Sequence, residues 1–392
     1  MSYLCLFICL IVLSPLTAFG QPSFPNNPAE GARLFSEKGC FRCHAILGEG
    51  GHVGHDLGRV DIGGSQLAIA GDLLNHAPTM NAKMAEMKVI WPRLTGAEVE
   101  SLVAYLYYVH YFDQAGNTVR GEKLFSGRGC HSCHSSTGKN ASAPPLAAFP
   151  RDLSPIFLAK ALWNHGPSMK AAMAQRGISW PKFEGTEIMD LVAYLKGAAR
   201  GEAVSYHAPG NPNEGIKVFQ NKGCVRCHGS EAGAARIDLS ERSRGLKKSL
   251  TQVVARMWNH APDIFGRMQE VRMAVPRFTE KEIADLVASL YFLNYFDPPP
   301  DSAAGQKLFS QKQCSVCHSA GGGAQGVGPD LSVTRKASSV MEMVASIWNH
   351  APFMQSLMKE KNIPWPKFEE NELNYLLGYL QYVRSSTPPA KP

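Results

Sequence analysis

The chain has 392 residues, of which 44% are hydrophobic and 19% are charged. These values are typical of a globular protein and exclude a disordered or collagen-like chain. No apolar run in the mature chain reaches the roughly 18 to 20 residues that a membrane-spanning helix needs, so we expect no integral membrane segment there. The formal net charge is +7 and the basic residues form no stripe, so nucleic acid is not an expected partner.

Residues 1–20 have the features of a secretory signal peptide. An apolar stretch from Leu4 to Leu13 precedes a small-residue cleavage site that ends at Gly20. Met1-Ser2-Tyr3 lacks the usual Lys or Arg, and the alternative is an uncleaved anchor. The leader predicts export, with the periplasm as the expected location and the cell exterior as the alternative.

Eight of the ten cysteines form four copies of one motif, Cys-x-x-Cys-His. This motif is the attachment signal of c-type haem, because its turn presents two thiols to the porphyrin vinyl groups and places the histidine under the iron. A zinc site would need a second pair of ligands in each domain, and a redox dithiol would need no histidine. We therefore expect four covalently bound haems. The predicted covalent ligands are Cys40, Cys43, Cys130, Cys133, Cys224, Cys227, Cys314 and Cys317, and the predicted proximal iron ligands are His44, His134, His228 and His318.

The motif histidines are 90, 94 and 90 residues apart along the chain, so each haem is expected to have its own domain. Each repeat opens with a helix whose N-cap is Asn27, Asn117, Asn211 or Asp301. The capping boxes Thr95-x-x-Glu98 and Thr279-x-x-Glu282 begin the last helix of two repeats. Glycine and phenylalanine four residues apart in the first helix predict that it crosses the last helix, with Phe and Tyr in contact. The glycines are Gly31, Gly121, Gly215 and Gly305; the phenylalanines are Phe35, Phe125, Phe219 and Phe309.

This order of features resembles the class I c-type cytochromes: Gly and Phe in a first helix, Cys-x-x-Cys-His, a later Met, and Leu-x-x-Tyr in a last helix. The resemblance covers the mature chain four times, except that Ser289 replaces the tyrosine in the third repeat. It implies an all-α fold of four tandem domains, each a small helical fold around one haem. It also implies that a proline carbonyl after the motif accepts a hydrogen bond from the proximal histidine. Repeats two and four have this proline, Pro144 and Pro329, whereas His55 and Ile237 replace it in the others, which predicts unequal haem potentials.

The sixth iron ligand has two candidate sets in the sequence. A methionine recurs 39 or 40 residues after each motif histidine, and thioether ligation would raise the haem potential. This is the favoured set: Met84, Met173, Met268 and Met358. The alternative is bis-histidine ligation through the imidazoles of the Asn-His-Ala/Gly-Pro segments: His76, His165, His260 and His350.

The connections between repeats predict two dihaem pairs, repeats one with two and three with four, joined by a looser hinge from Arg200 to Pro212. Pro298-Pro299-Pro300 makes a short, stiff spacer within the second pair. The predicted boundaries are a signal peptide over 1–20, cytochrome c domains over 27–113, 117–199, 211–297 and 301–384, a linker over 200–210 and a disordered tail over 385–392.

The expected function is single-electron transfer between a respiratory donor and a terminal acceptor or reductase, by an exported tetrahaem cytochrome with no catalytic residues. Its partners would be redox proteins, with peripheral association to a membrane complex as a further expectation. Two alternatives stay open: a haem enzyme, such as a peroxidase or small-molecule oxidoreductase, with one five-coordinate haem, or a permanent cytochrome subunit of an oxidoreductase complex.

Overall fold

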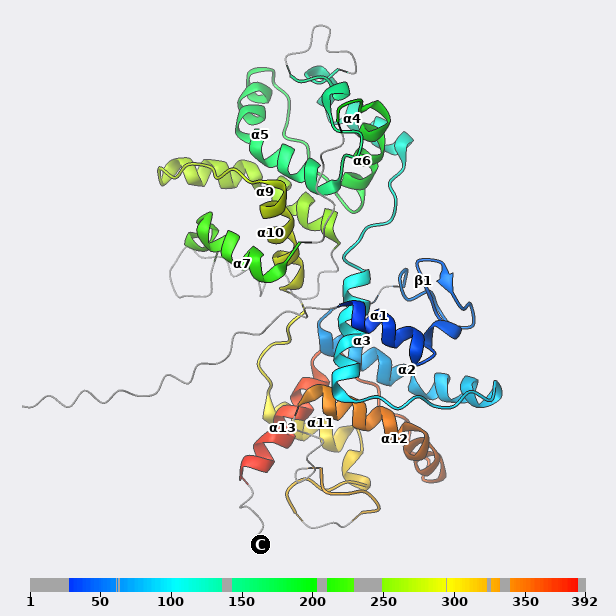
Figure 1. Cartoon of the computed structure of the whole chain (residues 1–392). Coiled ribbons are helices and arrows are strands. Elements are labelled where there is room, and N and C mark those ends of the chain that lie inside the picture. Colours follow the sequence, from blue (N-terminus) through cyan, green and yellow to red (C-terminus); the bar gives the residue numbers. More distant parts are fainter. Residues whose placement is uncertain are drawn as a thin grey trace, which may run out of the picture.

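The computed structural model describes residues 28–60, 62, 64–135, 143–202, 210–228, 249–293, 295–322, 326–331 and 339–386. Within these ranges most residues are helical, and the one described sheet is an antiparallel hairpin of two short strands, β1 (Ala45–Ile46) and β2 (Glu49–Gly50). The all-α fold class is therefore confirmed (Figure 1).

The same elements recur in each of the four repeats, which we call domains 1 to 4. A first helix leads into a 3-10 turn that holds the Cys-x-x-Cys-His motif, and a 21-residue middle helix and a last helix follow. The first helices are α1 (Pro28–Glu37), α4 (Thr118–Gly127), α7 (Pro212–Asn221) and α11 (Ser302–Gln311). The middle helices are α2 (Gln66–Glu86), α5 (Pro155–Gln175), α9 (Leu250–Glu270) and α12 (Val340–Glu360). The last helices are α3 (Gly96–Val109), α6 (Glu187–Ala198), α10 (Glu280–Phe292) and α13 (Glu372–Ser386). The motif turns are η1 (Cys40–Arg42), η2 (Cys130–Ser132), η4 (Cys224–Arg226) and η5 (Cys314–Val316), and η3 (Leu146–Ala148) is specific to domain 2.

The helix ends follow from their capping residues. The side chains of Asn117, Asn211 and Asp301 accept hydrogen bonds from first-turn amides, as predicted, whereas Asn27 lies outside the described residues. Both predicted capping boxes, at Thr95 and Thr279, are present. These caps mark the start of α4, α7 and α11 among the first helices and of α3 and α10 among the last helices.

The predicted crossing of the first and last helices is confirmed. A Cβ added at Gly31 would lie 2.0 Å from the carbonyl oxygen of Ser101, so only glycine permits this contact. Gly121, Gly215 and Gly305 make the same approach in the other domains. The Phe35 ring lies 5.9 Å from the Tyr105 ring, and the equivalent pairs in domains 2 and 4 are 5.4 and 5.7 Å apart. In domain 3, where Ser289 replaces tyrosine, the Phe219 ring lies 6.4 Å from the ring of His228.

The predicted pairing of the domains is wrong. Helix α12 of domain 4 packs on α2 and α3 of domain 1, and α9 of domain 3 packs on α5 and α6 of domain 2. Figure 1 shows the blue helices of domain 1 together with the yellow to red helices of domain 4 in one half of the molecule, and the green to olive helices of domains 2 and 3 in the other. The pairs are therefore 1 with 4 and 2 with 3. The prediction was based on linker length, which limits how far apart consecutive domains can lie but does not determine which domains pack on one another.

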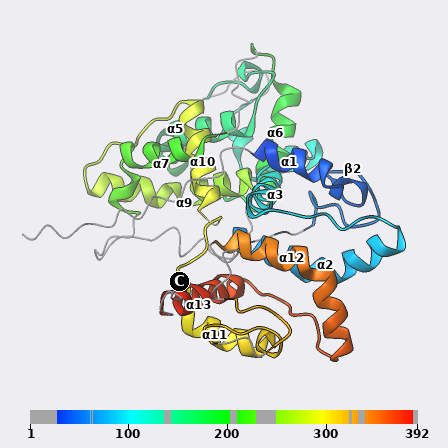
Figure 2. The same ribbon diagram turned by 60° about the horizontal axis from the view of Figure 1, so that its bottom comes forward.

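An aromatic cluster joins the two pairs between domains 1 and 3. The hydroxyl of Tyr107 donates to the carbonyl of Tyr291 at 3.0 Å, and the hydroxyl of Tyr291 donates to the carbonyl of Tyr107 at 2.8 Å. The main-chain N–H of Leu250 donates to Tyr111 O, and that of Gln66 donates to Tyr295 O. Tyr107 and Tyr291 are equivalent positions of the two domains, 184 residues apart in the sequence, and the same spacing relates Tyr111 to Tyr295 and Gln66 to Leu250. Each domain therefore makes the same bonds to the other. The domains lie in the order 2, 3, 1, 4, and the C-terminal ends of α3 and α10 meet where the two pairs join, near the centre of Figure 2.

The ends and the linker are described in part. Helix α13 continues through Ser386, two residues into the predicted tail, while 387–392 and the leader lie outside the described residues. Arg200 and Gly201 belong to domain 2, since their N–H groups donate to Ala147 O and Phe149 O, and 203–209 are outside the described part. In the part of the chain that the structure describes, no helix has the length and apolar character to cross a bilayer.

Candidate functional site

All four Cys-x-x-Cys-His motifs form the same compact turn. The main-chain N–H of His44 donates to the carbonyl of Cys40 at 3.0 Å, and the corresponding distance in the other three motifs is 2.9 Å. The eight motif thiols are free and only partly buried. Burial raises the pKa of the first cysteine of each motif to about 11, so these thiols stay protonated near neutral pH, unlike the reactive thiol of a redox dithiol.

The proximal imidazoles are oriented by backbone carbonyls, as the resemblance implies. Nδ1 of His134 lies 3.1 Å from the carbonyl of Pro144, and Nδ1 of His318 lies 3.1 Å from that of Pro329. In domain 1 the carbonyl of His55 takes this role at 2.9 Å. A histidine that donates from Nδ1 presents Nε2 to a metal, and the bond fixes the orientation of the ring. The equivalent segment of domain 3, around Ile237, lies outside the described residues.

Two glycines make room for the proximal rings. A Cβ at Gly54 would lie 2.4 Å from Cε1 of His44, and a Cβ at Gly328 would lie 2.5 Å from Cε1 of His318. The main chain therefore closes directly against one side of each imidazole. These features fit a covalently attached c-type haem: two thiols, an imidazole oriented by a backbone carbonyl, and main chain packed closely against that imidazole.

The two candidate sets of distal ligands lie on the same helices. His76 and Met84 are eight residues apart in α2, which is roughly 12 Å along a helix axis, so they cannot both bind one iron. The ring centroid of His76 lies 6.4 Å from that of His44. Two imidazoles bound to opposite sides of one metal have centroids about 6 Å apart, because metal–nitrogen bonds are about 2 Å long. Burial lowers the pKa of His76, and the neighbouring His44 lowers it further, so the ring is neutral near pH 7, as a ligand must be.

The other three histidines of this set share one hydrogen bond to their own helix. Nδ1 of each lies 2.8 to 3.1 Å from the carbonyl four residues earlier in its own helix, which leaves Nε2 directed away from the backbone. These residues are His165, His260 and His350. Of the methionine set, Met268 is buried and the others are half-buried.

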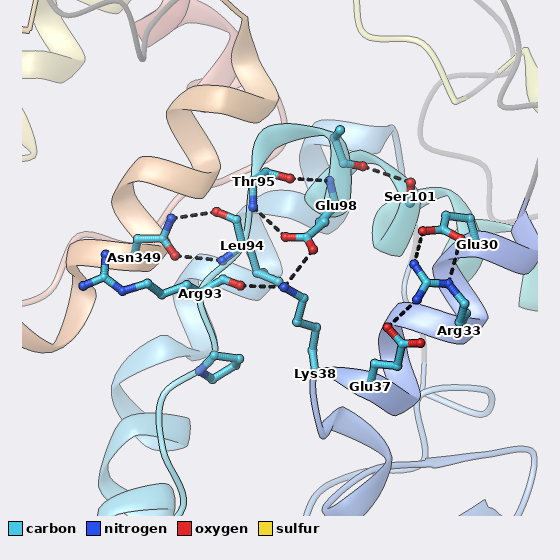
Figure 3. Close-up of polar contacts among 12 residues, drawn as sticks. Glu30, Arg33, Glu37, Lys38, Arg93, Leu94, Thr95, Glu98, Ser101 and Asn349 are labelled. Carbon is cyan, nitrogen blue, oxygen red and sulfur yellow. Dashed lines mark hydrogen bonds and ion pairs between the residues drawn. The ribbon is translucent and has the colours of Figure 1, made fainter.

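The asparagine before each of these histidines contacts the paired domain, a role that the sequence interpretation missed. We call the segment between the middle and last helices of each domain its strap: 88–94, 177–183, 272–278 and 362–368. Asn349 of domain 4 accepts from the N–H of Leu94 at 2.9 Å and donates to its carbonyl at 2.6 Å (Figure 3). The other three asparagines make the same two bonds: Asn75 to Phe368, Asn164 to Phe278 and Asn259 to Phe183.

The tryptophans also belong to these interfaces. All six indole N–H groups donate to a carbonyl of the paired domain, at 2.7 to 3.0 Å. Trp91 stacks on Trp348 with centroids 4.2 Å apart, and Trp180 stacks on Trp258 at 4.0 Å. The recurrence of Trp-Asn-His and Trp-Pro in the sequence was the available signal for this role.

Comparison with protein families agrees with these sites. The cytochrome c family model matches residues 28–109, 118–199 and 302–384, which is more than half of the chain. The chain belongs to the cytochrome c family. Neither the curated proteins nor the solved structures that were compared with it gave a match. The matched ranges are domains 1, 2 and 4, and domain 3 has the same helices and the same motif turn.

Proposed function

We propose that this cytochrome is an exported tetrahaem protein that carries single electrons between a respiratory donor and a terminal acceptor or reductase. The observation that carries the proposal is the motif turn, which recurs four times with the same geometry, together with the proximal rings of domains 1, 2 and 4, each oriented by a backbone carbonyl. A c-type haem supplies one-electron redox chemistry when bound, and the chain holds and orients it and keeps water from the iron. The leader sequence supports export, and the periplasm is the proposed location.

We further propose that the distal ligands are His76, His165, His260 and His350. The 6.4 Å separation of the His44 and His76 rings favours this set in domain 1, and the common orientation of the other three imidazoles extends it. A second imidazole lowers the haem potential relative to a thioether. The methionine set, Met84, Met173, Met268 and Met358, stays a prediction that the same experiments test.

The arrangement of domains suggests the order of electron transfer. Domains 1 and 3 are central and domains 2 and 4 are at the ends, so electrons would pass through the order 2, 3, 1, 4 rather than along the sequence. Redox partner proteins would then bind at the end domains.

Carbon monoxide binding to the reduced holoprotein tests both proposals. A carrier with four six-coordinate haems binds it slowly or not at all, whereas rapid binding by a quarter of the haem would indicate one open site and the enzyme alternative. In the variant His76→Ala one haem of four should become reactive, and in Met84→Leu none should. The opposite pattern would assign the methionine as the ligand of domain 1. Near-infrared spectra of the ferric protein distinguish the two ligand sets independently.

A further inference from the structure

The straps of domains 1, 3 and 4 are tied to the haem motif of their own domain by a lysine two residues before the first cysteine. In domain 1 the Lys38 ammonium donates to the carbonyl of Arg93 at 2.9 Å and pairs with Glu98 at 2.7 Å (Figure 3). Lys38 lies two residues before Cys40, and both charged side chains are only 25% exposed. Burial raises the pKa of Glu98, but the bonds from Lys38 and Thr95 outweigh it and keep the carboxylate ionised. The end of the strap is thus fixed to the entry of the motif.

The same strap is held from the other side by the paired domain. Asn349 binds both polar groups of the Leu94 backbone, and it directly precedes His350 on α12. A continuous series of contacts therefore runs from the middle helix of domain 4, through Leu94 and Arg93, to Lys38 and the motif of domain 1. The series connects Asn349 on α12 to the motif at Cys40, although these residues are 309 positions apart in the sequence.

The connection is reciprocal and recurs in the other pair. Asn75 binds Phe368 at 2.7 Å through both bonds, and the Lys312 ammonium, two residues before Cys314, donates to Lys367 O and pairs with Glu372 at 2.7 Å. In the pair of domains 2 and 3, Asn164 holds the strap that Lys222 ties to Cys224. Asn259 binds the strap of domain 2 at Phe183, and in that domain Arg128, two residues before Cys130, pairs with Glu187 at the start of α6.

We propose that these four asparagines are positioning residues that make the potential of each haem depend on the paired domain. This inference rests on the proposed function, since it requires a haem in each motif. Without Asn349, the N–H and carbonyl of Leu94 would lose their partners within the interface and would need water instead. Water admitted beside the domain 1 haem stabilises the more highly charged ferric state, because haem potential depends on solvent exposure and on the surrounding hydrogen bonds.

The test compares full-length holoprotein variants. Asn349→Ala removes both bonds to the strap, and Asn349→Asp keeps the acceptor for the Leu94 N–H but removes the donor. The control is Asn81→Ala, because Asn81 donates to the Gln355 side chain at 2.9 Å across the same domain pair and lies on α2, outside the straps. Hydrogen exchange with mass spectrometry assigns each effect to a domain, and a spectroelectrochemical titration resolves the four haem potentials.

We expect Asn349→Ala to increase exchange in the domain 1 peptides that contain residues 38–44 and 88–95. One of the four haems should lose about tenfold in its equilibrium constant for reduction, which is 59 mV for one electron. Asn349→Asp should give a smaller change in the same direction. Asn75→Ala should move a different haem, that of domain 4, and the double variant should move both.

The inference is overturned if Asn349→Ala shifts the potentials no more than Asn81→Ala, or if its exchange changes fall on the domain 4 motif, 314–318. Neither result would contradict the proposed four-haem electron carrier, because the haem content and the resistance to carbon monoxide would be unchanged. Failure of the proposed function is recognised separately, by fewer than four covalent haems in the unmodified protein.

Discussion

Replacing Gly121 with alanine should strongly destabilise domain 2. The new Cβ would lie 1.9 Å from the carbonyl oxygen of Asp190 and 2.8 Å from Cβ of Tyr194. Real Cβ contacts do not fall below 3.0 Å, so α4 and α6 would have to separate by about 1 Å at a close-packed crossing. Overpacking of this kind costs about 1–3 kcal/mol. We expect about 3 kcal/mol, because the nearest neighbours are backbone atoms that cannot turn away.

Gly197→Ala is the matched control within the same domain. Gly197 is an exposed residue of α6, and its new Cβ would meet nothing within 4 Å. Alanine is favoured over glycine in a helix by about 0.5–1 kcal/mol, so this variant should be slightly more stable than the unmodified protein. The two variants should therefore differ in stability by roughly 3–4 kcal/mol.

The measurement has to report on domain 2 alone, because a protein of four domains does not unfold in one two-state transition. Hydrogen exchange of the α4 and α6 amides at increasing urea concentration gives the free energy of opening of this helix pair. If Gly121→Ala and Gly197→Ala agreed within about 0.5 kcal/mol, the crossing would not be the rigid contact that the structure describes.

Three further predictions concern buried polar groups. Burial raises the pKa of Asp190, but hydrogen bonds from Arg120 and from a main-chain N–H outweigh it and lower the pKa below its ordinary 3.8. Domain 2 should therefore lose stability as the pH falls below about 4. Urea titrations should show this loss, and Asp190→Asn should abolish it. Tyr107→Phe should weaken the contact of domains 1 and 3 by about 1–3 kcal/mol, seen as faster exchange at the ends of α3 and α10, because it leaves the buried carbonyl of Tyr291 without its donor. Burial raises the pKa of Asp297 to about 6, so the folded state binds this proton more tightly than the unfolded state. Asp297 accepts a hydrogen bond from the hydroxyl of Ser65 across the contact of domains 1 and 3. Stability at this contact should therefore fall as the pH rises from about 4 to about 6, and Asp297→Asn should remove that dependence, as measured by hydrogen exchange at the ends of α3 and α10, corrected for the intrinsic exchange rate at each pH.

Features that lie within one repeat could be predicted from the sequence. The spacing of Cys40, Cys43 and His44 encodes a local turn, and Gly31 with Phe35 encodes one helix face, so neither depends on what lies beyond the domain. Caps such as Thr95 are equally local, since each bonds an amide three residues away. The structure confirms all of these because the same short-range chemistry decides them in any arrangement of the domains.

Features that depend on contacts between domains could not be predicted in this way. Asn349 is adjacent to His350, so its recurrence was explained by the histidine, although its two hydrogen bonds are made 255 residues away. Trp91 occurs beside Pro92 after a helix, which indicates a loop but not the indole of Trp348 on which it stacks. The partner of such a residue is set by tertiary packing, and no local pattern specifies it.

Which domains pack on one another depends on a few residues that differ between the repeats. Each domain carries the same asparagine and the same strap, so these contacts alone allow domain 1 to pair with any of the other three. The aromatic cluster differs: Tyr107 and Tyr291 occupy equivalent positions in domains 1 and 3, whereas Lys196 and Gln381 occupy them in domains 2 and 4. Charged and polar side chains there disfavour burial, so only domains 1 and 3 pack through this face. That contact joins domains 1 and 3 to each other and leaves the asparagine-bearing face of domain 1 free to pair with domain 4 and that of domain 3 free to pair with domain 2.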